Sequence, residues 1–418
     1  MQDKKSEINR PIISRYLTPL LLIGACVAAP QVSHAARSIP AKTVTTITDE
    51  SELPQAWPEE VGVDSRQLVR LSEWIRNDKL DVRSLLVIKD GKIIFERHSG
   101  GLVRDNNYEL YSVTKSVTSL LTGILEGDGK LAPNDKIVPR ILAKHPDLKE
   151  ALADKKDIAV RDLLSMSSGL FYKQTEGSDT LYYGVPNRLA LAAKSQARLP
   201  PGKEFDYTDV NPVLAGAMVS AAAGQREELF AEEKLFKPLG MSHYRWDGID
   251  QTGSVSGGWG LRLRPIDMAK LGMLLLNGGQ WQGKQIVPNA WIKQMTTPAN
   301  PTLAKDYGYY CWINHIVEGQ PEFGAMGFKG QFITVLPKQN AVIVMTSLLP
   351  TDGGLRDATY LQLYRRMVND YILPAMKPGQ KLVPDAARQA ALLKELRLSE
   401  QSKGVAGTAA AFNDAPER

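Results

Sequence analysis

Hydrophobic and polar residues alternate near both ends of the central part of the chain, which is typical of half-buried β-strands. Residues 84–98, "SLLVIKDGKIIFERH", alternate on both sides of Asp90-Gly91, a dipeptide suited to a two-residue hairpin turn. A second block contains "GYYCWINH" at 308–315, "GQFITVLP" at 330–337 and "AVIVMTS" at 341–347, separated by turn residues. Both blocks therefore predict antiparallel strands.

Between the two strand blocks, apolar residues recur at helical spacing in 187–196, 211–224 and 265–279. A further helix is predicted at 357–376, where it would cover one face of the sheet. Strands at both ends with helices between them predict an α+β fold. We expect one antiparallel sheet built from the N- and C-terminal strands, flanked by helices, with a mostly helical insertion.

The domain boundaries follow from changes in composition along the chain. Residues 52–376 contain no long linker rich in Pro or Ser and no repeat, so they are expected to form one catalytic domain. Residues 377–418 are rich in Ala, Gln and Lys and predict a helical extension followed by a frayed tail.

The first 35 residues predict a secretory signal. Basic residues precede the apolar stretch "YLTPLLLIGACVAAP", and "SHA" at 33–35 fits a small-x-small cleavage site. The apolar run is shorter than the roughly 20 residues that span a bilayer. Two routes stay open: cleavage after Ala35, which leaves a linker at 36–51, or attachment of a lipid to Cys26 after "IGAC". Either route predicts export to a bacterial periplasm.

Composition excludes several classes of partner. The chain has 418 residues, 43% of them hydrophobic, and a net charge of only +5, so no nucleic-acid-binding stripe is indicated. With Cys26 and Cys311 as the only cysteines, no disulfide framework is expected. Neither a metal nor a cofactor is predicted, and the oligomeric state stays open, a homodimer included. The histidines of the mature chain lack metal-ligand spacing; they are His98, His145, His243 and His315.

Candidate chemistry begins at Ser112 and Lys115, at the start of "SVTKSVTSLLTGILEGDGK" (112–130), which predicts a helix. Residues three apart share a helix face, so the lysine amine can reach the serine hydroxyl, while backbone N–H groups point out of the helix start. A nucleophilic serine needs such a base and such an oxyanion site. Burial would lower the pKa of Lys115 toward neutrality. The alternative is that Ser112 is an ordinary N-cap.

Other segments strengthen the catalytic interpretation of this serine. Together with "YSVTKSVTSLLTG", the segments "VRDLLSMSSGL" (160–170), "FDYTDVNPVLAG" (205–216) and "AMGFKGQFITVLP" (325–337) occur in order. From about residue 54 to residue 373 the chain resembles the serine beta-lactamase and penicillin-binding-protein superfamily. Within it, the chain is similar to class C-like esterases and 6-aminohexanoate-dimer (nylon-oligomer) hydrolases.

The resemblance implies a beta-lactamase/transpeptidase-like fold and a set of catalytic roles. Ser112 would be the nucleophile, and Lys115 with Tyr207 would act as general base and acid, because a neighbouring ammonium favours the phenolate. The backbone N–H groups of Ser112 and Phe328 would bind the oxyanion. The alternative for Tyr207 is a buried core aromatic with its hydroxyl satisfied.

Two positions depart from the pattern of the superfamily. Asp209 stands where the second motif usually has Asn; a carboxylate near Lys115 would raise the pKa of that lysine, unless Asp209 turns outward. The third motif reads Ala325-Met326-Gly327 and lacks the usual Lys or His. On a strand, Lys329 would point to the same side as Gly327, outside the usual position. Poor penicillin binding is therefore expected, and esters or linear amides are favoured.

The predicted function is an exported serine hydrolase that cleaves a small-molecule ester or linear amide through an acyl-enzyme on Ser112. Two alternatives stay open: a binding or penicillin-sensor-like protein of the same fold without turnover, and a peptidoglycan DD-carboxypeptidase. The second is disfavoured by the missing cation at Ala325. The further candidates for substrate contact are Asp209, Gly327, Lys329, Tyr172 and Tyr183; the two tyrosines alternatively face solvent from a loop.

Overall fold

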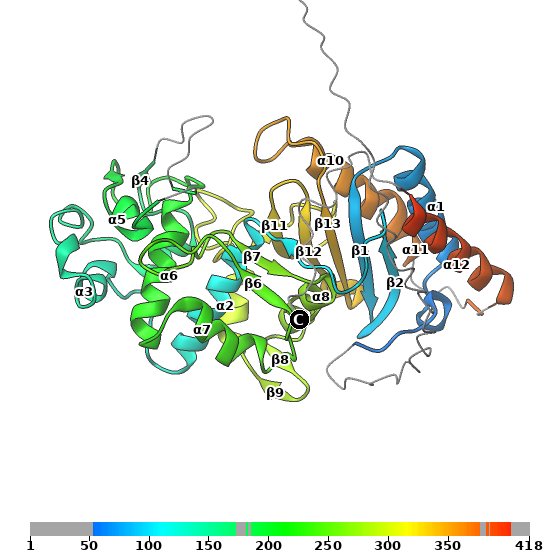
Figure 1. Cartoon of the computed structure of the whole chain (residues 1–418), viewed down its shortest axis with the longest axis horizontal. Coiled ribbons are helices and arrows are strands. Elements are labelled where there is room, and N and C mark those ends of the chain that lie inside the picture. The colour runs from blue at the N-terminus through cyan, green and yellow to red at the C-terminus, as the bar shows by residue number, and fades with distance from the viewer. Residues whose placement is uncertain (1–52, 173–180, 183–184, 377–381, 384, 403–418) are drawn as a thin grey trace, which may run out of the picture. The chain divides into compact units, whose positions relative to one another are not determined.

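Six antiparallel strands form the central sheet (Figure 1). In spatial order they are β10 (Trp312–Ile313), β11 (Phe323–Gly327), β12 (Gln331–Leu336), β13 (Ala341–Ser347), β1 (Val82–Lys89) and β2 (Lys92–His98). The predicted hairpin is present, and Asp90 and Gly91 take the positive φ angles of 50° and 75° that its turn requires. β1 pairs with β13 from Val82↔Ser347 to Lys89↔Ala341. The N- and C-terminal strands therefore meet in one sheet, and the predicted α+β fold is confirmed.

This computed structural model describes residues 53–172, 181–182, 185–376, 382–383 and 385–402. The predicted signal at 1–35 with Cys26, the linker at 36–51 and Tyr183 lie outside the described residues. Within the described ranges, no helix is long and apolar enough to cross a membrane.

The C-terminal strands differ from the prediction in two places. The block at 308–315 contains only the two-residue strand β10. β11 lies inside the second block, where hydrophobic patterning did not mark a strand, because "FGAMG" holds two glycines and lacks β-branched residues. A Cβ at Gly324 would overlap the backbone carbonyl of Ile333 in β12, so the close pairing of these strands explains that glycine.

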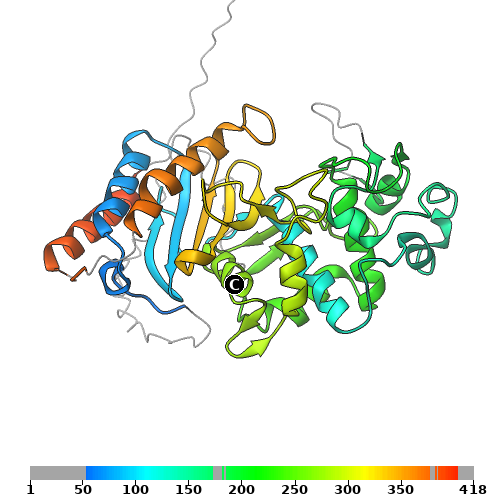
Figure 2. The same cartoon turned by 180° about the vertical axis from the view of Figure 1, so that it is seen from behind.

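Helices cover both faces of the sheet (Figures 1 and 2). α8 (Pro265–Leu276) packs on one face, against β1, β12 and β13. The other face is covered by α1 (Ser65–Asn77), α10 (Thr359–Arg366) and α11 (Leu373–Ala375). The ring of Tyr364 in α10 stacks on Phe332 of β12, with 3.9 Å between centroids. The predicted helix at 357–376 thus covers the sheet, although it is divided by a π-helical segment.

A buried polar cluster attaches the C-terminal helix α12 (Ala386–Gln401) to α1 and β2. Glu395 accepts hydrogen bonds from Ser72 at 3.0 Å and from two nitrogens of Arg76 at 3.0 and 3.1 Å. Arg97 of β2 donates to Ser72 at 3.1 Å, and burial lowers the pKa of Arg97 to about 10. Because Glu395 is 3% exposed, its buried carboxylate depends on these donors for its hydrogen bonds.

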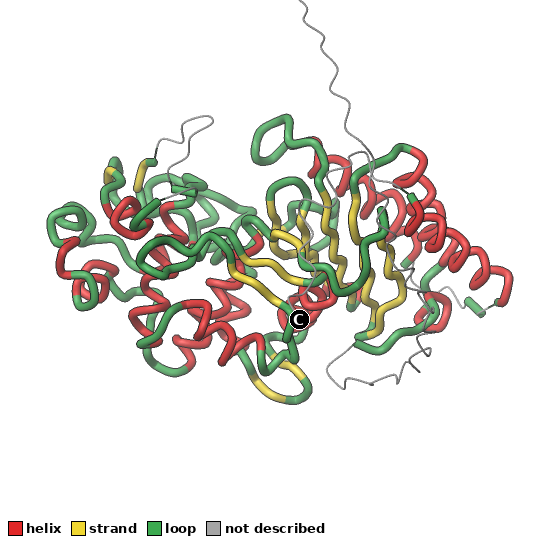
Figure 3. Tube along the Cα trace, viewed as in Figure 1, coloured by secondary structure: helices red, strands yellow, loops and turns green. Residues whose placement is uncertain are grey.

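Apart from α8, the segments between β2 and β10 form a part beside the sheet that contains most of the short helices; all helices are drawn red in Figure 3. Its helices are α2 (Val113–Gly127), α3 (Ile137–Leu142), α4 (Val160–Leu164), α5 (Arg188–Ala193), α6 (Val210–Ala223), α7 (Glu227–Ala231) and α9 (Asn289–Met295). Its short strands are β3 (Tyr108–Glu109), β4 (Leu170–Phe171), β5 (Gln196–Ala197), β6 (Tyr244–Trp246), β7 (Leu261–Leu263), β8 (Gln280–Trp281) and β9 (Lys284–Gln285). The described residues also form short 3-10 or π-helical segments: η1 (Pro58–Val61), η2 (Pro146–Leu148), η3 (Glu232–Phe236), η4 (Pro337–Gln339) and η5 (Met367–Ile372). α2 packs directly against α6, and this contact positions the candidate site.

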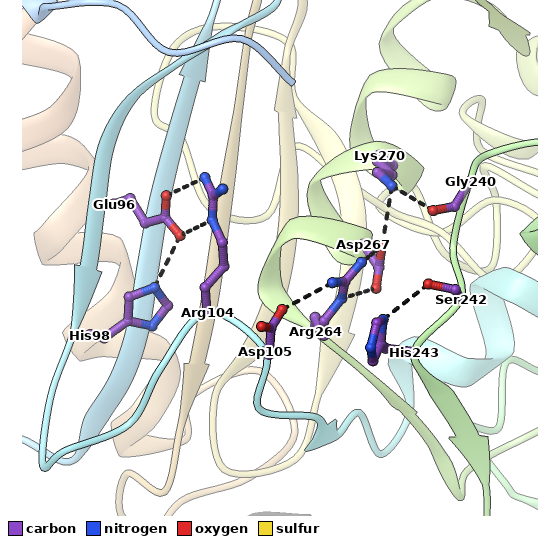
Figure 4. Close-up of polar contacts among 10 residues, drawn as sticks. All are labelled: Glu96, His98, Arg104, Asp105, Gly240, Ser242, His243, Arg264, Asp267 and Lys270. Atoms are coloured by element: carbon purple, nitrogen blue, oxygen red, sulfur yellow. Dashed lines mark hydrogen bonds and ion pairs between the residues drawn. The ribbon is translucent and has the colours of Figure 1, made fainter. Parts of the chain in front are cut away.

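The start of α8 is held by a cluster of buried charges (Figure 4). Arg264 donates to Asp267 at 2.7 Å and to Asp105 at 3.1 Å. Lys270 lies 3.5 Å from Asp267 and donates to the Gly240 carbonyl at 2.9 Å. The fully buried Asp267 is therefore paired with two cations, as a buried carboxylate requires.

Candidate active site

Ser112 lies at the start of α2, the helix whose apolar residues Val117, Leu120 and Leu121 are buried in the core. It occupies the N-cap position, but its side chain makes no capping hydrogen bond. Its Oγ instead accepts a hydrogen bond from Lys115 Nζ at 2.8 Å. The preceding residue, Tyr111, has a positive φ of 47°, an unusual conformation for an aromatic residue. The geometry thus favours the nucleophile over the ordinary N-cap.

Lys115 is 1% exposed, and its ammonium group is surrounded by oxygen atoms of Ser112, Gly258, Asp209 and Tyr207. Its Nζ lies 2.8 Å from Ser112 Oγ, 3.0 Å from the Gly258 carbonyl oxygen and 2.6 Å from Asp209 Oδ1. An ammonium group has three protons to donate, and these oxygen atoms are enough to accept all of them. The site is therefore built around a charged Lys115.

The electrostatics of the site agree with a charged lysine. Burial alone would lower the pKa of Lys115, but the Asp209 carboxylate, and after it Tyr207, raise this pKa above its usual value. The sequence left two orientations open for Asp209, and the structure has it pointing inward. The expectation that burial leaves a neutral amine is therefore wrong, because the carboxylate outweighs the loss of solvent.

Tyr207 and Asp209 are placed by α6. Asp209 is the N-cap of that helix, and Tyr207 lies in the loop just before it. Lys115 Nζ lies 5.2 Å from the centroid of the Tyr207 ring, and a hydrogen bond between these side chains contributes to the raised pKa of Lys115. The ring itself stacks on Trp312, with 5.7 Å between centroids. Tyr207 thus packs on the core and also reaches the lysine.

The end of β11 lies against the segment that precedes Ser112. A Cβ at Gly327 would overlap the carbonyl oxygen of Leu110, two residues before Ser112, so only glycine fits here. Phe328 lies in the turn after β11 and not on the strand, and its ring meets the Tyr111 ring edge-on at 5.8 Å. The segment proposed to supply the second oxyanion donor therefore lies beside the nucleophile.

The remaining substrate-binding candidates have different surroundings. Lys329 is also in this turn, with a φ of 63°, so the argument that a strand would aim it with Gly327 is wrong. Its ammonium nevertheless lies 5.9 Å from the ring centroid of Tyr111, the residue that precedes Ser112. Tyr172 follows β4 and packs, half-buried, against the hydrophobic core.

Sequence reasoning missed Gly257, Gly258 and Trp312. Gly258 supplies the carbonyl that holds Lys115, and a Cβ there would lie 2.8 Å from Pro212. The glycine pair in "SGGWG" is a signal for close backbone approach that could have indicated this contact. No comparable pattern marks Trp312, which reaches Tyr207 only through the fold.

The histidines and carboxylates of the described residues form no group of three that could hold a metal ion. His98 bonds Glu96 at 3.1 Å, and His243 bonds Ser242 at 3.0 Å; Figure 4 shows these two contacts well apart. His315 packs on Trp312, and burial lowers its pKa to about 4.

Comparisons with known proteins agree with this geometry. Residues 82–365 match the beta-lactamase family profile. A protein of Escherichia coli K12 named "Putative D-alanyl-D-alanine carboxypeptidase" is 24% identical over 375 residues, covering 71% of this chain and 86% of that protein. A solved structure called "putative beta-lactamase" from Bacteroides dorei has a TM-score of 0.62 at 17% identity and covers 75% of this chain and 99% of its own. A "Putative 6-aminohexanoate-dimer hydrolase" from Bacillus anthracis has a TM-score of 0.61 at 19% identity, covering 77% and 87%.

Proposed function

Because the chain belongs to the beta-lactamase family, we propose that this serine hydrolase cleaves an ester or linear amide through an acyl-enzyme on Ser112. The observation that supports the proposal most directly is the contact of Lys115 with Ser112, Gly258 and Asp209. A buried ammonium that donates a hydrogen bond to a serine oxygen holds that oxygen in a fixed position.

In the proposed reaction, Ser112 Oγ bonds to the acyl carbon and its proton passes to the phenolate oxygen of Tyr207, which the neighbouring Lys115 ammonium stabilises. That proton then goes to the leaving alcohol or amine as its bond to the acyl carbon breaks. The backbone N–H groups of Ser112 and Phe328 stabilise the oxyanion. Water repeats the sequence on the acyl-enzyme and releases the acid.

The substrate class is inferred from the third motif, Ala325-Met326-Gly327. Ala325 is 2% exposed and offers no charge where superfamily members have a cation that grips the beta-lactam carboxylate. We therefore propose that p-nitrophenyl esters and linear amides turn over faster than benzylpenicillin. Steady-state hydrolysis of p-nitrophenyl butyrate, a linear amide and benzylpenicillin by the purified protein tests this order. Faster turnover of penicillin would contradict it, and one-to-one labelling without turnover would indicate a binding protein.

A second candidate, a D-alanyl-D-alanine carboxypeptidase, is favoured by the name of the Escherichia coli relative and by one contact. The ammonium of Lys329 lies 5.9 Å from the ring of Tyr111, the residue before the nucleophile, so this part of the site holds a cation despite Ala325. A terminal carboxylate would be its partner. Release of D-alanine from a peptide ending in D-Ala-D-Ala, lost in Lys329→Ala while ester turnover stays, would support this candidate. No release by the wild type would exclude it.

We also propose that the protein is exported, on the signal pattern at 1–35. Fractionation of cells that express the full chain, with mass spectrometry of the mature N-terminus, tests this. A soluble periplasmic form starting after Ala35 and a lipid-modified form starting at Cys26 are the two expected products. An uncleaved protein in the cytoplasm would refute export.

A further inference from the structure

A buried carboxyl group from α7 contacts α2 at Thr118, one helical turn after the catalytic lysine. Glu227, the first residue of α7, is 2% exposed, and its Oε1 lies 2.7 Å from Thr118 Oγ1. Thr118 follows Lys115 by three residues on α2, so the two side chains share a face of that helix. A Cβ at Gly216 of α6 would overlap Glu227 Oε2. α6 therefore leaves a space that this carboxyl group fills.

The hydrogen bonds of Thr118 determine the protonation of Glu227. Thr118 Oγ1 also lies 2.9 Å from the carbonyl oxygen of Gly257. A carbonyl only accepts, and a hydroxyl has one proton to give. If Thr118 donates to Gly257, the contact with Glu227 is satisfied only when Glu227 is the donor, as a neutral carboxylic acid. An ionised Glu227 would compete for the same proton and leave a buried acceptor unpaired.

Burial favours the same state. Burial raises the pKa of Glu227 to about 8; a hydrogen bond that Thr118 would donate to the ionised form lowers it by less, and the charge of Glu228 raises it further. Glu228 is itself paired with Arg226 at 2.7 Å. The other titratable groups around Glu227 are Tyr310 and those that line the adjoining cavity of about 360 Å³, namely Lys144, His145, Arg188 and Arg226. Glu227 thus keeps its proton through neutral pH and loses it above about pH 8.

Gly257 and Gly258 connect this carboxyl group to the site. The carbonyl oxygen of Gly257 accepts from Thr118 Oγ1 at 2.9 Å. The carbonyl oxygen of Gly258 accepts from Lys115 Nζ at 3.0 Å. A Cβ at Gly257 would lie 2.5 Å from the Pro212 carbonyl oxygen and 3.0 Å from Thr118 Oγ1, so this segment is pressed between α2 and α6. Any shift at Gly257 is therefore transmitted to the carbonyl that holds Lys115.

We propose that Glu227 is a positioning residue for Lys115: as a carboxylic acid it donates to Thr118, which donates to Gly257 and so fixes the Gly258 carbonyl. The inference rests on the proposed role of Lys115 in acylation. It predicts that the reactivity of Ser112 depends on a donor at position 227, although Glu227 does not touch the substrate.

The test compares the second-order rate of Ser112 labelling by a fluorophosphonate, from pH 6 to pH 10, in full-length variants. Glu227→Gln keeps a donor and should stay within about twofold of wild type at pH 7, whereas Glu227→Leu should fall by about tenfold. Thr118→Ser and Thr118→Val form a matched pair: Thr118→Ser, which keeps the hydroxyl, should label like the wild type, and Thr118→Val should fall by about tenfold. At pH 9.5 the wild type should lose reactivity relative to Glu227→Gln, because only the wild type gains a buried charge.

Equal rates for Glu227→Gln and Glu227→Leu, or the same alkaline decline in wild type and Glu227→Gln, would overturn the inference. A wild type that does not label at all would refute the proposed function instead. Crystal structures at pH 7 and pH 9.5 then decide the inference without any activity: the Gly258 carbonyl should move away from Lys115 in the wild type only. An unmoved carbonyl in the wild type at pH 9.5 would reject it.

Discussion

Asp209 sets the charge of the catalytic lysine, and replacing it tests that statement. In Asp209→Asn the residue keeps its shape and an acceptor oxygen but loses its negative charge beside Lys115, from which it is 2.6 Å away. Asp209 raises the pKa of Lys115. Its replacement should therefore lower the apparent pKa at which the coupled pair Lys115 and Tyr207 releases a proton. The acidic limb of the pH–rate profile for acylation should therefore move to lower pH.

The size of the effect follows from the contact. Two unit charges 2.6 Å apart attract each other by about 6 kcal/mol at an effective dielectric constant of about 20. The amide oxygen still accepts a hydrogen bond and recovers part of this, so about 2 to 3 kcal/mol of ammonium stabilisation should be lost. On the acidic limb, at a fixed pH, this corresponds to at least a roughly tenfold faster acylation.

The assay is the burst of p-nitrophenol from p-nitrophenyl butyrate, measured by stopped flow between pH 4.5 and pH 9. Asp206→Asn is the matched control, since it removes a carboxylate from the same loop, three residues before Asp209. Its profile should coincide with the wild type. An acidic limb that stays in place in Asp209→Asn, or that moves to higher pH, would refute the reasoning about Lys115.

Three further predictions concern other parts of the molecule. Gly327→Ala should lower ester turnover at least about tenfold, because a methyl group displaces the oxyanion segment; Gly354→Ala, in open space, is the control, and equal turnover in both would contradict this. Glu395→Ala should cost about 2 kcal/mol in urea unfolding without changing turnover, because Arg76 loses its partner; unchanged unfolding would show that α12 is not held there. Between pH 4.5 and about pH 8, Glu227 is protonated only in the folded state. The free energy of unfolding should therefore fall by at most about 5 kcal/mol as the pH rises through this interval. Calorimetry should find this fall absent in Glu227→Gln, and a persisting fall would contradict it.

The sheet was predictable from sequence wherever local signals and tertiary structure agree. The hairpin turn at Asp90-Gly91 needs positive φ angles, and the residues themselves supply that conformation. β11 gave no such signal, because its glycines allow close contact with neighbouring backbone. Gly324 lies against the backbone of β12, and Gly327 lies against the carbonyl of Leu110. Patterning of hydrophobic residues does not report contacts of that kind.

The candidate site divides in the same way. Ser112 and Lys115 are three apart on one helix, so their contact follows from helical geometry. The orientation of Asp209 could not be predicted, because α6 and α2 meet only in the folded chain. Gly258 and Glu227 were missed for the same reason, since each reaches α2 from a segment more than 100 residues away.

The central claim is that Ser112 is a working nucleophile, and intact-protein mass spectrometry after fluorophosphonate treatment tests it most directly. The account predicts a single adduct on the wild type and none on Ser112→Ala, with hydrolysis of p-nitrophenyl acetate and butyrate abolished in that variant. An unlabelled wild type, or equal labelling of both proteins, would contradict it.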